Sequence, residues 1–270
     1  MKAVAKYFNR PILLRSIAET TTNGVVGPDV SDIIADAIRN CNGDIKKAEQ
    51  SIIFLDEFDK LARRNHGMTS GRDVGGESVQ QILLKYLEGD KVQVQMGSKR
   101  NPFQDNMVEF DTSNVLFILA GAFEGITEIV KSRVNKKIIG FGAKEKKYTN
   151  DDYLNMVSTE DLLAFGIISE LIGRCSNVVI YNQLTEQNLI DILTKPKNAI
   201  IKQYQELFKM DNINLKFTSE ALKIIAQLAI KKKTNARGLR GILSKSLANI
   251  EYMIPDRNDI KDIIITDKII

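Results

Sequence analysis

The 270-residue chain is predicted to adopt an α/β fold, with a parallel-sheet domain at residues 1–182 and a smaller, α-rich domain at residues 183–270. In the first part, apolar runs of strand length alternate with segments of helical periodicity, as expected when helices connect parallel strands. In the second part, helical periodicity dominates and only short strand-like runs occur. With 43% hydrophobic and 27% charged residues, the composition is that of an ordinary globular protein.

The elements of the first domain follow from its apolar patterns. The clearest is a strand at 51–56, because four consecutive apolar residues form a run typical of a strand buried on both faces. Segments 29–41 and 78–88 place apolar residues three and four positions apart, which predicts helices. The charged segment 143–152 predicts a loop. The remaining predictions are a helix at 1–9 and strands at 10–17, 114–120 and 177–181.

The second domain is predicted to begin with a helix at residue 186, which Thr185 can cap through its side-chain oxygen. Apolar residues at helical spacing follow in three further segments. The predicted helices are 197–210, 219–232 and 236–253, and the predicted short strands are 214–217 and 262–265.

Two adjacent carboxylates, Asp56 and Glu57, follow the apolar strand directly. Ligands of open parallel sheets bind at the carboxyl ends of the strands. In a nucleotide hydrolase with this pattern, called Walker B, the first carboxylate holds Mg²⁺ through water and the second polarises the water that attacks the γ-phosphate. The alternative is a structural strand that ends in solvated acids, and for the motif alone the two interpretations are equally supported.

Ten sequence blocks occur in the order found in one protein family, and on them the chain resembles the ClpX family of AAA+ unfoldases. This resemblance covers the whole chain and implies an AAA+ large domain, a small lid domain, a hexameric ring, ATP and Mg²⁺ as cofactors, and delivery of unfolded protein substrates to the ClpP peptidase. The blocks are residues 24–30, 54–60, 71–81, 83–89, 111–113, 121–123, 139–143, 171–174, 195–199 and 235–240.

The phosphate-binding P-loop of such ATPases, G-x-x-x-x-G-K-[ST], does not occur in the chain. By the resemblance, Met1 lies a few residues after the P-loop lysine, so we expect an N-terminally truncated member that also lacks the zinc domain and the P-loop strand. The missing strand would separate the strand at 177–181 from the rest of the sheet. The alternative function is a non-hydrolysing fragment, or a partner that joins a ring or docks on ClpP without ATPase activity.

Two arginines acquire roles through the resemblance. Arg174 matches the arginine finger, which reaches the ATP of the neighbouring subunit and stabilises charge on the transferred phosphoryl group. Arg237 matches the sensor-2 arginine, which contacts the phosphates of its own subunit's nucleotide. Ile192 and Leu193 match the adenine-pocket region. Without the resemblance, Arg174 would be interpreted as a surface arginine and the two aliphatic residues as helix-core packing.

Three loops are implied to meet protein partners. Val25 and Val26 lie in the pore loop that grips substrate, although the family normally has an aromatic residue where Val25 stands. Lys99 and Arg100 lie in a second loop, which faces incoming substrate. The ClpP-docking tripeptide corresponds to Ile139, Gly140 and Phe141. Its alternative interpretation is the end of a buried strand, whereas the docking interpretation has the exposed Ile and Phe fill pockets on the partner.

Composition excludes several other classes. No apolar run is long enough for a transmembrane helix, and the N-terminal residues lack the apolar h-region of a signal peptide. The chain has two cysteines, so no disulfide framework is expected. This predicts that the protein is located in the cytoplasm or in an organelle matrix. Lysine clusters and a net charge of +4 raise the hypothesis of nucleic-acid binding. We favour exposed, solvated lysines instead, because no recognition fold or interleaved aromatic residues accompany them.

Overall fold

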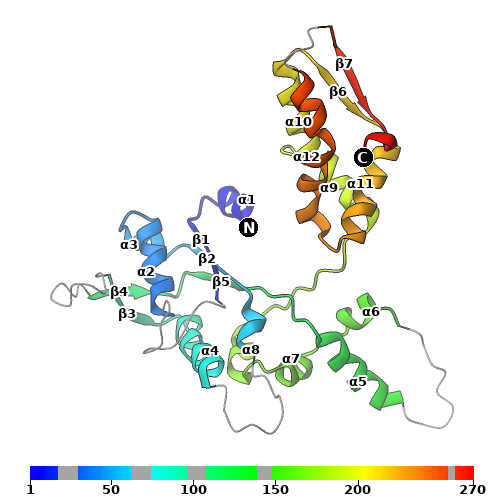
Figure 1. The fold of residues 1–270 in the computed structure, drawn as a ribbon. Helices are drawn as coiled ribbons and strands as arrows, with labels where there is room; N and C mark the ends of the chain where they lie inside the picture. Colours follow the sequence, from blue (N-terminus) through cyan, green and yellow to red (C-terminus); the bar gives the residue numbers. More distant parts are fainter. Residues whose placement is uncertain (18–29, 63–73, 97–106, 139–147, 255–258) are drawn as a thin grey trace. The chain divides into compact units, whose positions relative to one another are not determined.

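The computed structural model describes residues 1–17, 30–62, 74–96, 107–138, 148–254 and 259–270. The chain forms two compact units, Met1–Tyr181 and Asn182–Ile270 (Figure 1). We refer to them as unit 1 and unit 2. Each has its own hydrophobic core, as expected of units that fold around separate apolar surfaces. No helix in the described ranges is both long and apolar enough to cross a membrane.

Unit 1 is organised around a three-stranded parallel sheet with the order β1-β2-β5. Its strands are β1 (Ile12–Ser16), β2 (Ile52–Asp56) and β5 (Leu116–Leu119). The register pairs Ser16 with Asp56 and Leu55 with Leu119, so the carboxyl ends of the strands meet at one edge of the sheet. The strands predicted at 10–17, 51–56 and 114–120 are confirmed.

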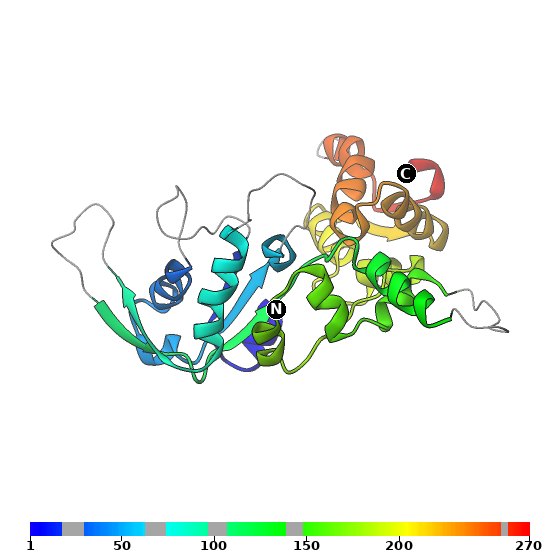
Figure 2. The ribbon, with the colours of Figure 1, turned by 90° about the horizontal axis from the view of Figure 1, so that it is seen from below.

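The core of unit 1 forms where β2 packs against helices. Ile53 and Leu55 of β2 are fully buried, and they share one apolar cluster with residues of α2 (Ser31–Asn40) and α4 (Val74–Leu87). Figure 2 shows α4 alongside β2. The helices predicted at 29–41 and 78–88 are thus confirmed within the described residues. The short helices α1 (Lys2–Tyr7) and α3 (Ile45–Ala48) complete this half of the unit.

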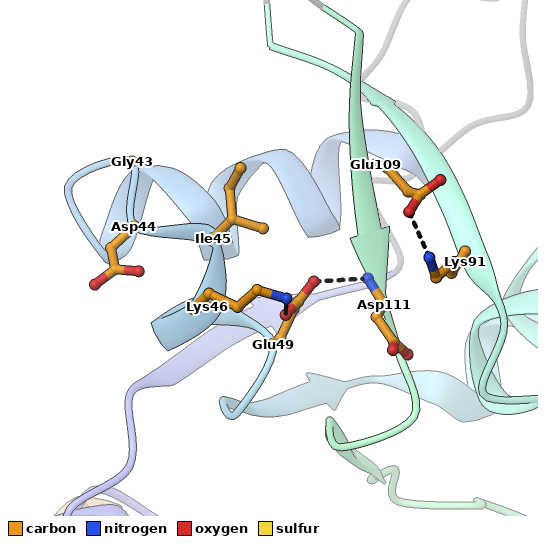
Figure 3. Close-up of a pocket in the computed structure, with 8 residues that line it drawn as sticks. All are labelled: Gly43, Asp44, Ile45, Lys46, Glu49, Lys91, Glu109 and Asp111. Atoms are coloured by element: carbon orange, nitrogen blue, oxygen red, sulfur yellow. Dashed lines mark hydrogen bonds and ion pairs between the residues drawn. The ribbon is translucent and has the colours of Figure 1, made fainter.

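An antiparallel hairpin, which the sequence patterns did not reveal, is formed by β3 (Lys91–Gln95) and β4 (Met107–Asp111). Val94 and Phe110 anchor it in the core of unit 1. The hairpin, α3 and the turn before α3 line the pocket of Figure 3. There the Glu49 side chain accepts the backbone N–H of Asp111 at 3.0 Å, and Lys91 pairs with Glu109 at 2.7 Å. The first contact ties the hairpin to the end of α3, and the second joins the two strands of the hairpin.

After β5, the described part of unit 1 contains four α-helices: α5 (Ile126–Ile138), α6 (Asn150–Asn155), α7 (Thr159–Phe165) and α8 (Ser169–Arg174). The loop predicted at 143–152 is wrong at its end, where α6 begins. Thr149 and Asp152 form a capping box, which satisfies backbone N–H groups at the start of that helix. Residues 143–147 lie outside the described residues.

The strand predicted at 177–181 is wrong: these residues adopt no regular structure. Val178, Val179 and Tyr181 are 56%, 69% and 87% exposed. A strand requires a neighbour for its backbone groups, and in the described part of the chain β5 pairs with β2 alone. An apolar run of strand composition therefore stays irregular and mostly exposed to solvent here.

Unit 2 is α-rich, with α9 (Glu186–Thr194), α10 (Ile200–Met210), α11 (Ser219–Lys231) and α12 (Asn235–Met253). A parallel pair, β6 (Asn214–Phe217) and β7 (Asp262–Ile265), packs beside them. All the helices and strands predicted for this part are confirmed. So is the cap by Thr185, whose side chain accepts the N–H of Asn188.

Candidate active site

The candidate site lies at the carboxyl edge of the parallel sheet. Asp56 is the last residue of β2 and is exposed. One of its carboxylate oxygens accepts the backbone N–H of Glu57 at 2.9 Å. This local bond holds the Asp56 carboxylate beside the turn that follows the strand. A carboxylate in this position can face a ligand at the sheet edge.

Glu57 occupies the left-handed backbone region, with φ of 59°. This conformation is uncommon for residues other than glycine and costs about 1–2 kcal/mol. A hydrogen bond of the next residue stabilises the turn: the N–H of Phe58 donates to the carbonyl of Ala120 at 2.8 Å. The turn therefore redirects the chain at Glu57, at the same edge of the sheet as Asp56.

The Glu57 side chain is oriented by β1. The hydroxyl of Ser16 donates to Glu57 Oε2 at 2.7 Å. Sequence reasoning did not single out Ser16. Its only signal is its place near the end of the predicted strand 10–17, because neighbouring parallel strands end at the same sheet edge. The arrangement leaves Glu57 with a second carboxylate oxygen that can accept a hydrogen bond from a water molecule.

Gly121 allows the chain after Glu57 to approach the end of β5 closely. That chain is the 3₁₀ helix η1 (Phe58–Leu61), in which Asp59 is buried. A Cβ atom at Gly121 would lie 2.4 Å from Asp59 Oδ1 and 3.0 Å from the backbone N of Asp59. The absence of a side chain at this position thus determines where η1, and with it Glu57, can sit.

Replacing Gly121 with alanine is expected to lower the free energy of unfolding by about 1–3 kcal/mol, the usual cost of overpacking. Gly173 is the matched control, because a Cβ there meets nothing within 4 Å and α8 favours alanine over glycine. Urea denaturation followed by circular dichroism compares the two variants. Equal stabilities would show that the contact with Asp59 relaxes without cost.

Arg174 is the last residue of α8, and its side chain is 53% exposed. Its Nη2 lies 3.5 Å from Glu88 Oε1, just beyond the end of α4 in the same chain. Exposed ion pairs of this kind contribute little to stability. Displacing Arg174 from Glu88 toward another anion therefore requires little free energy.

The nucleotide-contact residues proposed for unit 2 have different environments. Arg237 is exposed in the first turn of α12, and within the described ranges no hydrogen bond or ion pair is found for its guanidinium. Because a cation opposes the helix dipole at this end, an anion beside Arg237 would relieve that repulsion. Ile192 is half-buried, whereas Leu193 is fully buried in the core of unit 2. The adenine contact of both stays a prediction.

Seven of the predicted site residues lie outside the described residues. They are the pore and substrate residues Val25, Val26, Lys99 and Arg100, and the docking tripeptide Ile139, Gly140 and Phe141.

The donor set around β2 suits a magnesium ion held mainly by water and phosphate. Mg²⁺ commonly keeps several waters and takes one or two protein carboxylates. Asp56 supplies one such carboxylate at the exposed sheet edge. Across the residues that the structure describes, no group of three or more His, Cys, Asp or Glu side chains could hold a metal by itself. The residues present therefore fit an ion that arrives with its nucleotide.

Comparison with known proteins adds family evidence to this geometry. The family AAA domain (Cdc48 subfamily) matches residues 29–178, and the C-terminal, D2-small domain of ClpB protein matches residues 184–261. A Treponema denticola protein named ATP-dependent Clp protease ATP-binding subunit ClpX is 44% identical over 100% of this chain. The protein of the same name from Borrelia duttonii is 39% identical over 98% of the chain. The chain spans 66% and 62% of these two relatives, about two thirds of their length.

Proposed function

The chain belongs to the AAA family and is similar to ClpX along its whole length, and from this premise we propose that it acts as an ATP-dependent unfoldase subunit of a Clp-type protease. The observation that carries the proposal is the pair Asp56 and Glu57 at the carboxyl edge of the parallel sheet. Their position suits phosphoryl chemistry because both carboxylates meet a ligand bound at that edge.

Each residue of the site has a role in ATP hydrolysis. Asp56 orients a water of the Mg²⁺ shell, and Glu57 accepts a hydrogen bond from the attacking water and polarises it. Ser16 keeps the Glu57 carboxylate aimed along the sheet edge. When bound, ATP would supply the electrophilic phosphorus, and Mg²⁺ would neutralise the negative charge on the phosphate oxygens.

Each of the two arginines has a proposed role in binding phosphate. In a ring, Arg174 stabilises charge on the γ-phosphate bound by the neighbouring subunit. Arg237 binds the phosphates of the nucleotide in its own subunit. Ile192 and Leu193 contact the adenine of the same nucleotide. Their exposure, and the weak ion pair of Arg174, support these assignments. The hexamer that this requires is part of the proposal.

The proposed partners are ClpP and protein substrates. Phe141 and Ile139 anchor the chain on ClpP through apolar contacts, and Gly140 permits the turn between them. Val25 and Val26 contact the translocating polypeptide, and Lys99 and Arg100 attract its negatively charged segments.

The proposal is tested by measuring ATP hydrolysis and the ATP-dependent loss of fluorescence of a stably folded fluorescent substrate, with ClpP added. Hydrolysis coupled to unfolding supports it. The 270 residues contain no P-loop motif, so nucleotide binding by the chain is measured separately. Association with ClpP without nucleotide binding would instead support the non-hydrolysing partner.

Replacing Phe141 with alanine is expected to weaken association with ClpP at least tenfold, because large anchors carry most of the free energy of such contacts. Any ATP hydrolysis should be unchanged. The matched control is Phe8→Ala, which removes an exposed phenylalanine at a different place in unit 1. Co-sedimentation with ClpP provides the measurement. Unchanged binding by Phe141→Ala would exclude the tripeptide as the docking site.

A further inference from the structure

Gln80 of α4 is a fully buried polar side chain whose hydrogen bonds reach two distant segments of unit 1. Its Oε1 accepts the backbone N–H of Ile168 at 2.9 Å. Its Nε2 donates to the carbonyls of Leu61 at 2.8 Å and Gly166 at 3.3 Å. In this buried amide, both N–H donors and the oxygen make hydrogen bonds. Breaking any of them would cost free energy, because the group would be left buried without a partner. The side chain is thereby fixed in one orientation.

The two segments lead to the two kinds of proposed catalytic residue. Leu61 ends η1, which begins immediately after Glu57. Gly166 and Ile168 lie between α7 and α8, and Ile168 is the N-cap residue of the helix that ends at Arg174. One side chain thus spans from the Glu57 turn to the base of the arginine helix.

A second observation shows that α4 is fitted to η1 at this point. Gly76 lies one helical turn before Gln80, and a Cβ atom there would be 2.7 Å from the carbonyl oxygen of Leu61. The glycine thus lets α4 approach the carbonyl that Gln80 binds. Just beyond the other end of α4, Glu88 pairs with Arg174. The helix therefore touches both segments at separate places.

We propose that Gln80 is a positioning residue that fixes the Glu57 turn relative to the arginine helix α8. The inference rests on the proposed function. In a ring, Glu57 serves the nucleotide of its own subunit and Arg174 serves that of the next. A rigid link between them inside one subunit couples the geometry of two adjacent sites. Gln80 does not touch the nucleotide and acts through η1 and α8.

The test uses Gln80→Met, which keeps the length of the side chain and removes its hydrogen bonds. Gln81→Met is the matched control, because Gln81 is the exposed neighbour on the same helix. Circular dichroism checks folding. If Gln80→Met does not fold, Gln80→Glu replaces it, since a glutamate keeps the acceptor for the N–H of Ile168 and loses the donor to Leu61. The kinetic readout is ATP hydrolysis by the assembled ring.

We expect Gln80→Met to lower kcat at least tenfold while KM changes less than twofold, and Gln81→Met to match the wild type. The double variant Gln80→Met/Arg174→Ala should lose less activity than the product of the two single losses, because part of the effect of Gln80→Met is exerted through Arg174. A folded Gln80 variant with wild-type kcat, or independent multiplicative losses in the double variant, would overturn the proposal.

Hydrogen–deuterium exchange separates failure of this inference from failure of the proposed function. If the wild-type chain hydrolyses no ATP, the unfoldase proposal fails, and the link is judged from exchange alone. The Gln80 variant should then show at least tenfold faster exchange in η1 and at the start of α8 together, with the rest of unit 1 unchanged. Unchanged exchange in either segment would contradict the link.

Discussion

Replacing Glu57 with glutamine is expected to lower kcat for ATP hydrolysis by about 100- to 10,000-fold, the contribution typical of a positioned general base. Glutamine has the same shape as glutamate. Its amide oxygen can accept the hydrogen bond that the Ser16 hydroxyl donates to Glu57. It lacks the negative charge that polarises the attacking water. Nucleotide binding should persist, because Asp56 and Arg237 are unchanged. Steady-state hydrolysis and binding of a fluorescent ATP analogue measure the two effects separately.

Glu124→Gln is the matched control, because Glu124 is another exposed glutamate of unit 1. It should hydrolyse ATP at the wild-type rate. A Glu57→Gln variant that retained more than a tenth of the wild-type kcat would remove Glu57 from its proposed role. Loss of binding together with turnover would instead indicate that Glu57 maintains the shape of the site.

Replacing Asp161 with alanine is expected to lower the free energy of unfolding of unit 1 by about 3–5 kcal/mol, the range found when one partner of a buried ion pair is removed. Asp161 is 1% exposed. It accepts Nε and Nη2 of Arg133, each at 2.8 Å, and the N–H and hydroxyl of Ser158 at 2.8 and 2.9 Å. Among the described residues, the alanine variant leaves the Arg133 guanidinium with one hydrogen bond, to the carbonyl of Met156.

The same contacts predict a pH dependence. Burial raises the pKa of Asp161, but hydrogen bonds from Arg133 and Ser158 outweigh burial and bring the pKa below its ordinary value. A carboxyl group with a depressed pKa in the folded state stabilises the fold above its unfolded pKa, about 3.9. That stabilisation is lost as the pH falls below 3.9 and through the folded-state pKa.

Urea denaturation at pH 7 and at successively lower pH tests this expectation. The difference in stability between the wild type and Asp161→Ala should be largest at pH 7. It should shrink as the pH falls below about 4, where the unfolded chain takes up the proton first, and further as the folded Asp161 carboxyl is protonated at lower pH. Glu160→Ala is the control, because Glu160 is the residue next to Asp161 and is exposed. A difference that stayed constant down to pH 2 would show that the ionised carboxylate is not what stabilises the fold.

Prediction from the sequence succeeded for elements whose structure depends on residues close to one another in the chain. The strand β2, the helix cap at Thr185 and the strands β6 and β7 all have local signals. These are an apolar run for β2, a capping residue for the helix, alternating polar and apolar residues for β6, and a run of isoleucines for β7. The hairpin of β3 and β4 was missed because its alternating pattern is short and strongly charged. The apolar segment 177–181 was wrongly predicted as a strand, since strand formation requires a partner that composition cannot reveal.

The candidate site divides in the same way. Asp56 and Glu57 could be found because they are adjacent and follow an unmistakable strand. The Ser16 contact joins residues 41 positions apart, and those of Gln80 to Gly166 and Ile168 join residues 86 and 88 apart. No periodicity in the chain identifies such pairs.

The sequence by itself determined the family, the α/β class and the carboxylate pair, because motifs, apolar runs and caps act over a few residues. Only the tertiary structure decided that Ser16 orients Glu57 and that Gln80 joins η1 to the arginine helix. It also decided that residues 177–181 remain unpaired. The physical reason is that a hydrogen bond between distant segments forms only after packing brings them together, so its existence depends on the whole core of unit 1.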